Sequence, residues 1–304
     1  MPLKVIKVSQ LQGHNAAIFD VFPDGKEEFL FTTGGDGWLV KWDLNDTATG
    51  KLIARTDIQN FTAIQVADNH FVCGNMHGGV HFIDLLNPED QKNIQHHKKG
   101  VFSLIETNGL LYSGGGDGKI TRWDTEKHLP SLSYQISHAS IRKILSIPEL
   151  GLLVIGTSDN NIYGLHAEDL SICWTIEKAH ENSVFSLAYL PQSKTLVSGG
   201  RDAMLRFWDL SKDIPSPVHA IPAHIYTIND IVYCQKPNLI ATASRDRTIK
   251  LWDASTYALL KVLEGPRDGG HFNSVNKLCW LNSRSQLVSV GDDRIGYVWG
   301  IKRE

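Results

Sequence analysis

The sequence predicts an all-β protein, a seven-bladed propeller of four-stranded antiparallel blades. Three observations lead to this fold class. A motif of eight to ten residues occurs seven times, its spacing matches the length of one blade, and the copies have the alternation and corner residues of a β-hairpin. We therefore expect residues 1–304 to form a single propeller, with blade motifs ending near residues 43, 84, 124, 166, 209, 253 and 300.

The motif is clearest at residues 34–43, GGDGWLVKWD, where an Asp-Gly corner separates two alternating segments. Close copies lie at residues 115–124, 200–209, 244–253 and 292–299, and weaker copies lie at 76–84 and 158–166. The residues aligned with Trp42 are 42, 83, 123, 165, 208, 252 and 299, so consecutive copies are 41, 40, 42, 43, 44 and 47 residues apart. A propeller blade takes ~40–45 residues, and the longer last spacing is explained by the loop at residues 268–270.

Five repeats combine a His, a Ser or Thr, an Asp and a Trp at similar offsets. They are His14, Thr32, Asp36 and Trp42; His97, Ser113, Asp117 and Trp123; His180, Ser198, Asp202 and Trp208; His224, Thr242, Asp246 and Trp252; and His271, Ser289, Asp293 and Trp299. One imidazole nitrogen can donate to the carboxylate while the other bonds the hydroxyl, which can also accept from the indole.

These repeats resemble those of the WD-repeat (WD40) family over essentially the whole chain. The resemblance implies that each set of four side chains is a structural hydrogen-bonded tetrad. It also implies that partners dock on the face that carries the loops around the tetrad His and the hairpin turn.

A His, a hydroxyl and a carboxylate also suggest a Ser-His-Asp catalytic triad. A nucleophile needs one exposed site with an oxyanion hole, whereas this combination recurs in five blades. His96 and His97 suggest a metal pair, but His97 already belongs to a tetrad. We therefore predict no catalytic residues and no metal site.

The second and fourth repeats depart from the pattern. In the second repeat Asp57 stands where His is expected and His77 stands where Asp is expected, which predicts an Asp–His pair. The fourth repeat has His138 and Asp159, with Ile155 and Leu165 in place of the hydroxyl and Trp. We expect packing to hold these two blades.

The amino-terminal segment is predicted to close the ring. Residues 3–8 alternate like a strand, and the last recognisable strand, residues 295–301, is only the third strand of blade seven. Residues 3–11 are therefore expected to supply the fourth strand, which removes an open sheet edge.

Composition narrows the class of partner. The formal net charge of −3 disfavours nucleic acid, and no segment approaches the ~18 apolar residues of a membrane span. The amino terminus lacks the apolar run of a signal peptide. The four cysteines lack zinc-site spacing and are expected to be free thiols in a cytoplasmic protein. A monomer without a cofactor is expected.

The WD40 resemblance places candidate partner contacts three and five residues after each His and one residue before each turn Asp. In blade two this rule selects Asn60 and Thr62. The predicted partner-binding residues are Phe19, Met76, Phe102, Arg142, Phe185, Arg201, Tyr226, Arg245 and Asn276. The predicted function is a non-enzymatic scaffold or adaptor that binds other proteins or peptides, including acidic ones, on this face. The alternative is a small-ligand-binding or hydrolytic propeller that uses its central channel.

Overall fold

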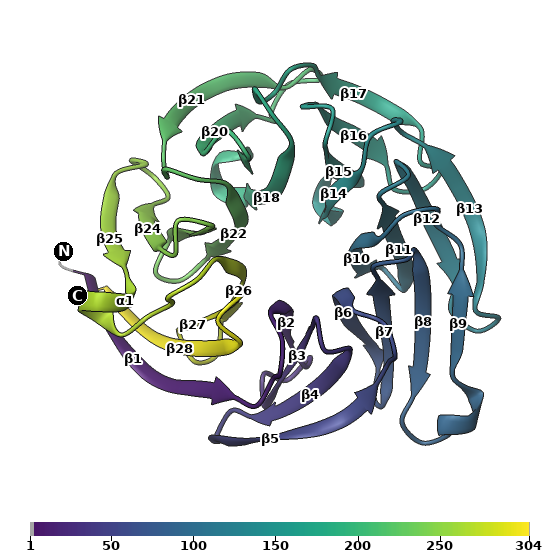
Figure 1. Cartoon of the computed structure of the whole chain (residues 1–304). Helices are drawn as coiled ribbons and strands as arrows, with labels where there is room; N and C mark the ends of the chain where they lie inside the picture. The colour runs from purple at the N-terminus through teal and green to yellow at the C-terminus, as the bar shows by residue number, and fades with distance from the viewer. Residues whose placement is uncertain (1–2, 304) are drawn as a thin grey trace.

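The computed structural model describes residues 3–303 as seven four-stranded antiparallel sheets arranged around a central channel (Figure 1). The first strand of each blade lines the channel and the fourth lies at the rim. This arrangement confirms the predicted fold class. No helix within the described residues has the length and apolar character needed to cross a membrane.

The strands follow one another outward in every blade. Blade one contains β2 (Ile18–Pro23), β3 (Phe29–Gly34), β4 (Trp38–Asp43) and β5 (Asp46–Arg55); blade two contains β6 (Asn60–Ala67), β7 (His70–Asn75), β8 (Gly79–Asp84) and β9 (Lys92–Gln95); blade three contains β10 (Val101–Thr107), β11 (Leu110–Gly115), β12 (Lys119–Asp124) and β13 (Leu129–Gln135).

The remaining blades repeat the order. Blade four contains β14 (Ile141–Ile147), β15 (Leu152–Thr157), β16 (Ile162–His166) and β17 (Ile172–Ile176); blade five contains β18 (Val184–Leu190), β19 (Thr195–Gly200), β20 (Met204–Asp209) and β21 (Ser216–Pro222); blade six contains β22 (Ile228–Cys234), β23 (Leu239–Ser244), β24 (Ile249–Asp253) and β25 (Leu259–Leu263); blade seven contains β26 (Val275–Leu281), β27 (Gln286–Gly291), β28 (Ile295–Arg303) and β1 (Leu3–Gln12). The helical segments are single turns that each begin with or near a Pro: η1 (Pro88–Asp90), η2 (Pro148–Leu150), η3 (Pro191–Ser193) and α1 (Gly265–Asp268).

The core is divided among the seven interfaces between blades. Seven apolar clusters are present in the described residues, and each draws on two neighbouring blades. Phe31 of blade one, for example, packs with Phe71 of blade two at a ring-centroid distance of 4.8 Å. Both faces of a blade are therefore buried, which explains the nearly continuous apolar character of the second strands.

Ring closure follows the prediction from the sequence. Strand β1 runs antiparallel to β28, from Leu3 opposite Arg303 to Gln12 opposite Ile295, with a bulge at Val8. Leu11 is fully buried in the cluster between blades seven and one. The first strand of the chain thus completes the last blade.

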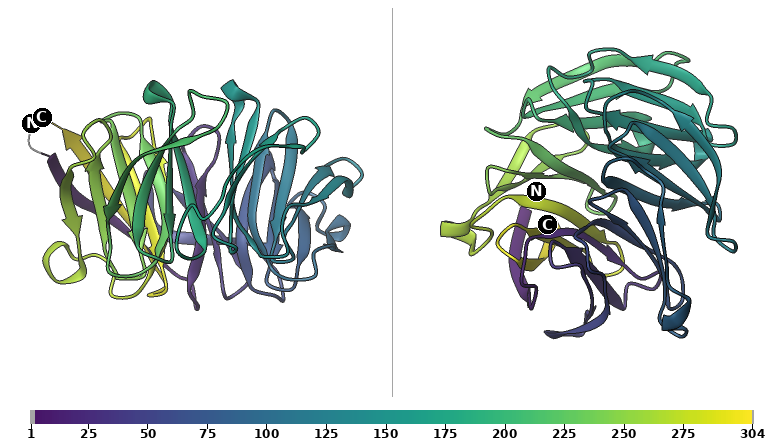
Figure 2. Two further views of the ribbon diagram at one scale, coloured as in Figure 1. Left: turned by 90° about the horizontal axis from the view of Figure 1, so that it is seen from above. Right: turned by 45° about the vertical axis from the view of Figure 1, so that its right-hand side comes forward.

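The two faces of the ring differ in their loops (Figure 2). The loops that lead into the channel strands lie beside the turns that follow the second strands, as shown by backbone bonds such as Gly35 N–H to Ala17 C=O and Arg201 N–H to Ser183 C=O. We call this the top face and the opposite one the bottom face.

Deleting residues 1–11 should lower the melting temperature by about 10 °C or more, because the burial of Leu11 alone is worth a few kcal/mol. It would also leave the edge of β28 unpaired and promote aggregation. Calorimetry with light scattering measures both effects. The full-length Val8→Ser variant, altered at the exposed bulge of β1, should melt like the wild type. A truncated protein that melts unchanged would contradict the closure.

Candidate functional site

The five predicted tetrads form as complete hydrogen-bonded chains. In blade one, His14 Nδ1 lies 2.9 Å from Asp36 Oδ2 and its Nε2 lies 2.8 Å from Thr32 Oγ1, which accepts from Trp42 Nε1 at 2.8 Å. The corresponding distances in blades three, five, six and seven lie between 2.8 and 3.0 Å.

One proton arrangement satisfies every member of a tetrad. The indole N–H donates to the hydroxyl, the hydroxyl donates to imidazole Nε2, and imidazole Nδ1–H donates to the carboxylate. The carboxylate also accepts backbone N–H groups; in blade one these are the amides of Asn15 and Trp38. Each tetrad therefore ties the loop before the channel strand to the following hairpin.

The tetrads shift the pKa of several of their acids. Burial alone would raise the pKa of Asp246, but the hydrogen bond and charge of His224 and the bonds from Thr248 outweigh it and hold the pKa well below its usual value. The pKa values of Asp36, Asp117 and Asp202 are lowered by the same balance. Burial lowers the pKa of His224 despite its carboxylate partner.

In blade four the residue at the His position is Ser137, and the assignment to His138 was wrong. Ser137 Oγ donates to Asp159 Oδ2 at 2.5 Å, whereas His138 is exposed. Tyr163 and Thr157 also donate to the Asp159 carboxylate. A polar network therefore holds this turn, in addition to the packing expected from the sequence.

In blade two the equivalent position is Thr56, one residue before Asp57. Thr56 Oγ1 donates to a backbone carbonyl and accepts from the side chain of Asn60 at 2.9 Å. The predicted pair of Asp57 and His77 is absent from the hydrogen bonds and ion pairs within residues 3–303, since Asn75 Oδ1 takes over the turn by accepting the amides of His77 and Gly79. A hydroxyl thus replaces the imidazole at this position, and the assignment to Asp57 placed the repeat one residue too late.

A β-bulge at the start of each channel strand creates a ring of seven equivalent residues. The register shifts after the first residue of every channel strand, so the second residue is left out of the ladder. The unpaired residues, here named the bulge ring, are Phe19, Phe61, Phe102, Arg142, Phe185, Asn229 and Asn276. A bulge commonly re-aims a side chain, and these side chains are neither fully buried nor fully exposed.

Five members of the bulge ring form a continuous arc of contacts. The Phe61 ring lies 5.5 Å from Phe19 and 5.2 Å from Phe102, measured between centroids. The Arg142 guanidinium carbon lies 4.4 Å from the Phe102 centroid and 5.0 Å from the Phe185 centroid. We call these five residues the aromatic arc.

The other two members of the bulge ring are held by hydrogen bonds. Asn229 donates to Ser274 Oγ and to the Val275 carbonyl, at 2.9 and 2.8 Å. Asn276 donates to the Ile18 carbonyl and to Asp292 Oδ1, at 3.0 and 2.7 Å. In blades six and seven the ring therefore braces neighbouring blades.

The remaining predicted contacts lie on the surface. Met76, Arg201, Tyr226 and Arg245 are all exposed. Asn60 and Thr62, selected by the misplaced repeat, are buried. The sequence analysis missed Phe61. Phe61 lies five residues after Thr56, just as Phe19 lies five residues after His14, so it becomes recognisable once Thr56 is placed at the His position. Ile225 and Phe272, large exposed side chains directly after their tetrad His, were also missed.

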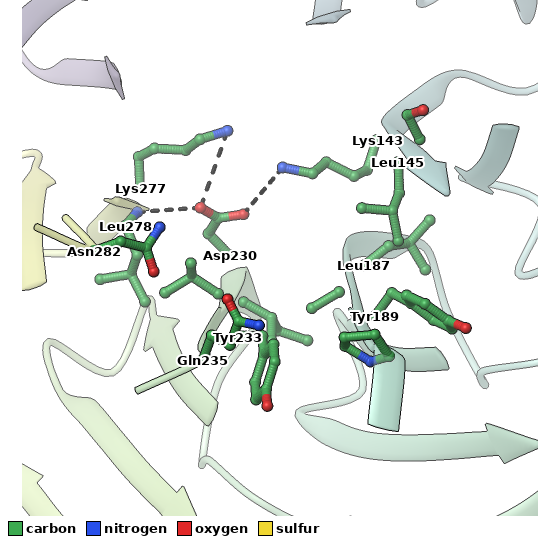
Figure 3. Close-up of a pocket in the computed structure, with 15 residues that line it drawn as sticks. Lys143, Leu145, Leu187, Tyr189, Asp230, Tyr233, Gln235, Lys277, Leu278 and Asn282 are labelled. Atoms are coloured by element: carbon green, nitrogen blue, oxygen red, sulfur yellow. Dashed lines mark hydrogen bonds and ion pairs between the residues drawn. The ribbon is translucent and has the colours of Figure 1, made fainter. Parts of the chain in front are cut away.

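The residue that follows the bulge-ring residue is charged in four blades, and these charged side chains meet across the channel. Lys143 Nζ lies 3.4 Å from Asp230 Oδ1, and Lys277 Nζ lies 3.5 Å from Asp20 Oδ1 and 4.0 Å from Asp230 Oδ2. Figure 3 shows Lys143 and Lys277 converging on Asp230 at one end of a cavity of about 440 Å³. Two lysines thus face two aspartates. Each of these four residues lies six positions in the sequence after the tetrad His of its blade, or after the residue that replaces that His.

Removing a tetrad hydroxyl should destabilise the fold. Ser198→Ala leaves His180 Nε2 and Trp208 Nε1 buried without a partner, which should lower the free energy of unfolding by about 2 kcal/mol or more. Urea denaturation measures the change. Ser211→Ala removes an exposed hydroxyl and should have almost no effect. Equal stability of the two variants would contradict the tetrad's structural role.

Acid should unfold the protein through the same networks. An Asp whose native pKa is lowered stabilises the fold above its unfolded pKa of about 3.9, and this stability is lost as the pH falls toward the native pKa. His224, whose native pKa is also lowered, adds a loss that begins below about pH 6.5. Melting temperatures between pH 7 and pH 3 should therefore fall, most steeply below about pH 4. Asp246→Asn, which keeps an acceptor but does not titrate, should show a smaller acid loss; an identical profile would rule out this origin.

Comparison with known proteins supports the architecture. The family model described as "WD domain, G-beta repeat" matches residues 171–209, 215–253 and 259–300. The WD40 β-propeller domain of Doa1 superposes with a TM-score of 0.83 at 17% identity, over 99% of this chain and 97% of that one.

The curated relatives that match this chain are longer proteins. An uncharacterized WD repeat-containing protein of Schizosaccharomyces pombe is 28% identical over 66% of this chain, and Denticleless protein homolog A of Xenopus laevis is 24% identical over 81%. The chain spans 53% and 36% of these two relatives. Residues 171–300 therefore contain three repeats that match the WD40 family model, and the chain as a whole has the fold of a seven-bladed propeller closed by its own first strand.

Proposed function

We propose that the protein is a non-enzymatic adaptor that binds segments of other proteins on its top face. The observation that carries this proposal is the aromatic arc: four Phe side chains and one Arg remain partly accessible beside the mouth of the channel. Aromatic residues and Arg are enriched at the centres of protein interfaces. The exposed Arg201, Arg245, Tyr226 and Met76 extend the same surface.

The alternative function in the channel has less support. Lys143 and Lys277, which lie beside the cavity in Figure 3, pair with Asp230, and Lys277 also pairs with Asp20, so aspartates of the described chain compensate both lysines. Asp20 and Asp230 also accept the backbone amides of Ala63 and Leu278 in the next blade, which gives them a structural role.

We also propose a cytoplasmic location. Cys73, Cys173, Cys234 and Cys279 are all free thiols. Cysteines that remain free thiols are typical of proteins in a reducing compartment.

Affinity capture tests the proposed surface. The double variant Phe185→Ala, Arg201→Glu should lose the partners retained by the wild type, because it removes one ring of the arc and reverses a charge beside it. A matched control, Leu52→Ala with Lys51→Glu, makes the same kinds of change on the exposed outer strand of blade one and should keep them. Circular dichroism confirms that both variants fold. Partners lost by the control and kept by the top-face variant would overturn the proposal.

A further inference from the structure

Arg142 is the one charged residue of the aromatic arc, and it makes three contacts. Its guanidinium lies between the rings of Phe102 and Phe185. Its Nε donates to Ser158 Oγ at 2.9 Å. A guanidinium that contacts two aromatic rings and is hydrogen-bonded through Nε loses little further freedom when it binds a ligand.

The charge of Arg142 has no carboxylate partner within residues 3–303. No Asp or Glu of this part of the chain lies within 4.0 Å of its guanidinium, whereas Lys143, the next residue, pairs with Asp230. Burial and the nearby charge of Arg201 lower the pKa of Arg142, which shows that the cation is partly desolvated and repelled by its neighbour. A half-buried cation without a counterion is costly, and an anion supplied by a partner relieves that cost.

The two terminal nitrogens of this guanidinium indicate which kind of ligand it can bind. With Nε bound to Ser158, the two terminal nitrogens remain to donate, and this planar fork matches the two oxygens of a carboxylate. Arg201 and Arg245 occupy the position before the turn Asp in the next two blades, so two further exposed cations lie on this side of the top face. Phe61 and Phe19 continue the arc on the other side of Phe102 and offer apolar surface.

We propose that Arg142 binds the carboxylate of an Asp or Glu side chain in a partner protein, while an apolar residue of the same segment packs on Phe61 and Phe102. This inference rests on the proposed top-face adaptor function and specifies its ligand as an acidic–apolar peptide segment. Blade four supplies the receptor because its bulge residue alone among the seven carries a charge.

A peptide selection on the full chain tests the assignment. The probe is a phage-displayed library of random twelve-residue peptides, from which the enriched sequences are synthesised. We expect an Asp or Glu at a constant position beside an apolar residue. Replacing that acid by its amide should weaken binding about tenfold to a hundredfold, the range for a charge-assisted bond.

A double-mutant cycle ties the loss to Arg142. Arg142→Gln should weaken binding of the acidic peptide by the same factor, and combining it with the amide peptide should cost little more, because the two groups form one interaction. Arg142→Lys should bind more weakly than wild type, since it keeps the charge but loses the planar fork. Lys98→Gln removes one exposed charge from the same face outside the arc and should change affinity less than twofold.

The outcomes separate this inference from the function it rests on. Peptides that bind through Phe61, as shown by loss in Phe61→Ala, but tolerate Arg142→Gln would overturn the carboxylate assignment and leave the adaptor function standing. A library that enriches no acidic peptide would overturn it as well. Peptides indifferent to Phe61→Ala, Phe185→Ala and Arg142→Gln alike would overturn both. Should Arg142→Gln fail to fold, the amide peptide and Arg142→Lys decide the question.

Discussion

Each blade of this protein has two apolar faces, and a single four-stranded sheet can bury them only between two neighbours. This constraint determines the architecture, because a row of blades would leave a face exposed at each end whereas a ring leaves none. The seven apolar clusters are the seven shared interfaces of that ring. The chain secures the last interface with β1, whose Leu11 packs between blades seven and one. The stability of the fold therefore depends on closure of the ring, because only the closed ring buries the last interface.

The tetrads and the bulge ring are consecutive parts of one local structure. A tetrad, or its substitute in blades two and four, anchors the loop before the channel strand, and the bulge begins within five residues of that anchor. The bulge then releases one side chain from the sheet toward the top face. The two blades without a full tetrad supply Phe61 and Arg142, which both contact Phe102 of blade three in the aromatic arc. The bulge therefore forms in these two blades without the standard tetrad.

The channel has two layers with opposite chemistry. The bulge ring presents aromatic surface at the top, together with a guanidinium that has no carboxylate partner in the described part of the chain. Directly after it in sequence, Asp20, Lys143, Asp230 and Lys277 neutralise one another across the channel. Asp20 and Asp230 also bond backbone amides of the next blade, so the inner layer braces the ring. The charges of this inner layer are therefore used within the fold, whereas the Arg142 guanidinium in the bulge ring can still accept an anionic partner.

The sequence by itself determined the number of blades, the five full tetrads and the strand that closes the ring. These features depend on short covalent spacings: a hairpin fixes the distance from hydroxyl to Asp to Trp, and the length of a blade fixes the repeat. Only the tertiary structure decided that Ser137 and Thr56 stand at the His position, because hydrogen-bonding groups of different shape can serve the same turn. It alone placed Phe61 between Phe19 and Phe102 and showed that, among residues 3–303, Lys143 has a carboxylate partner and Arg142 has none. Such contacts join blades about 40 residues apart, and no local spacing specifies which side chains meet across them.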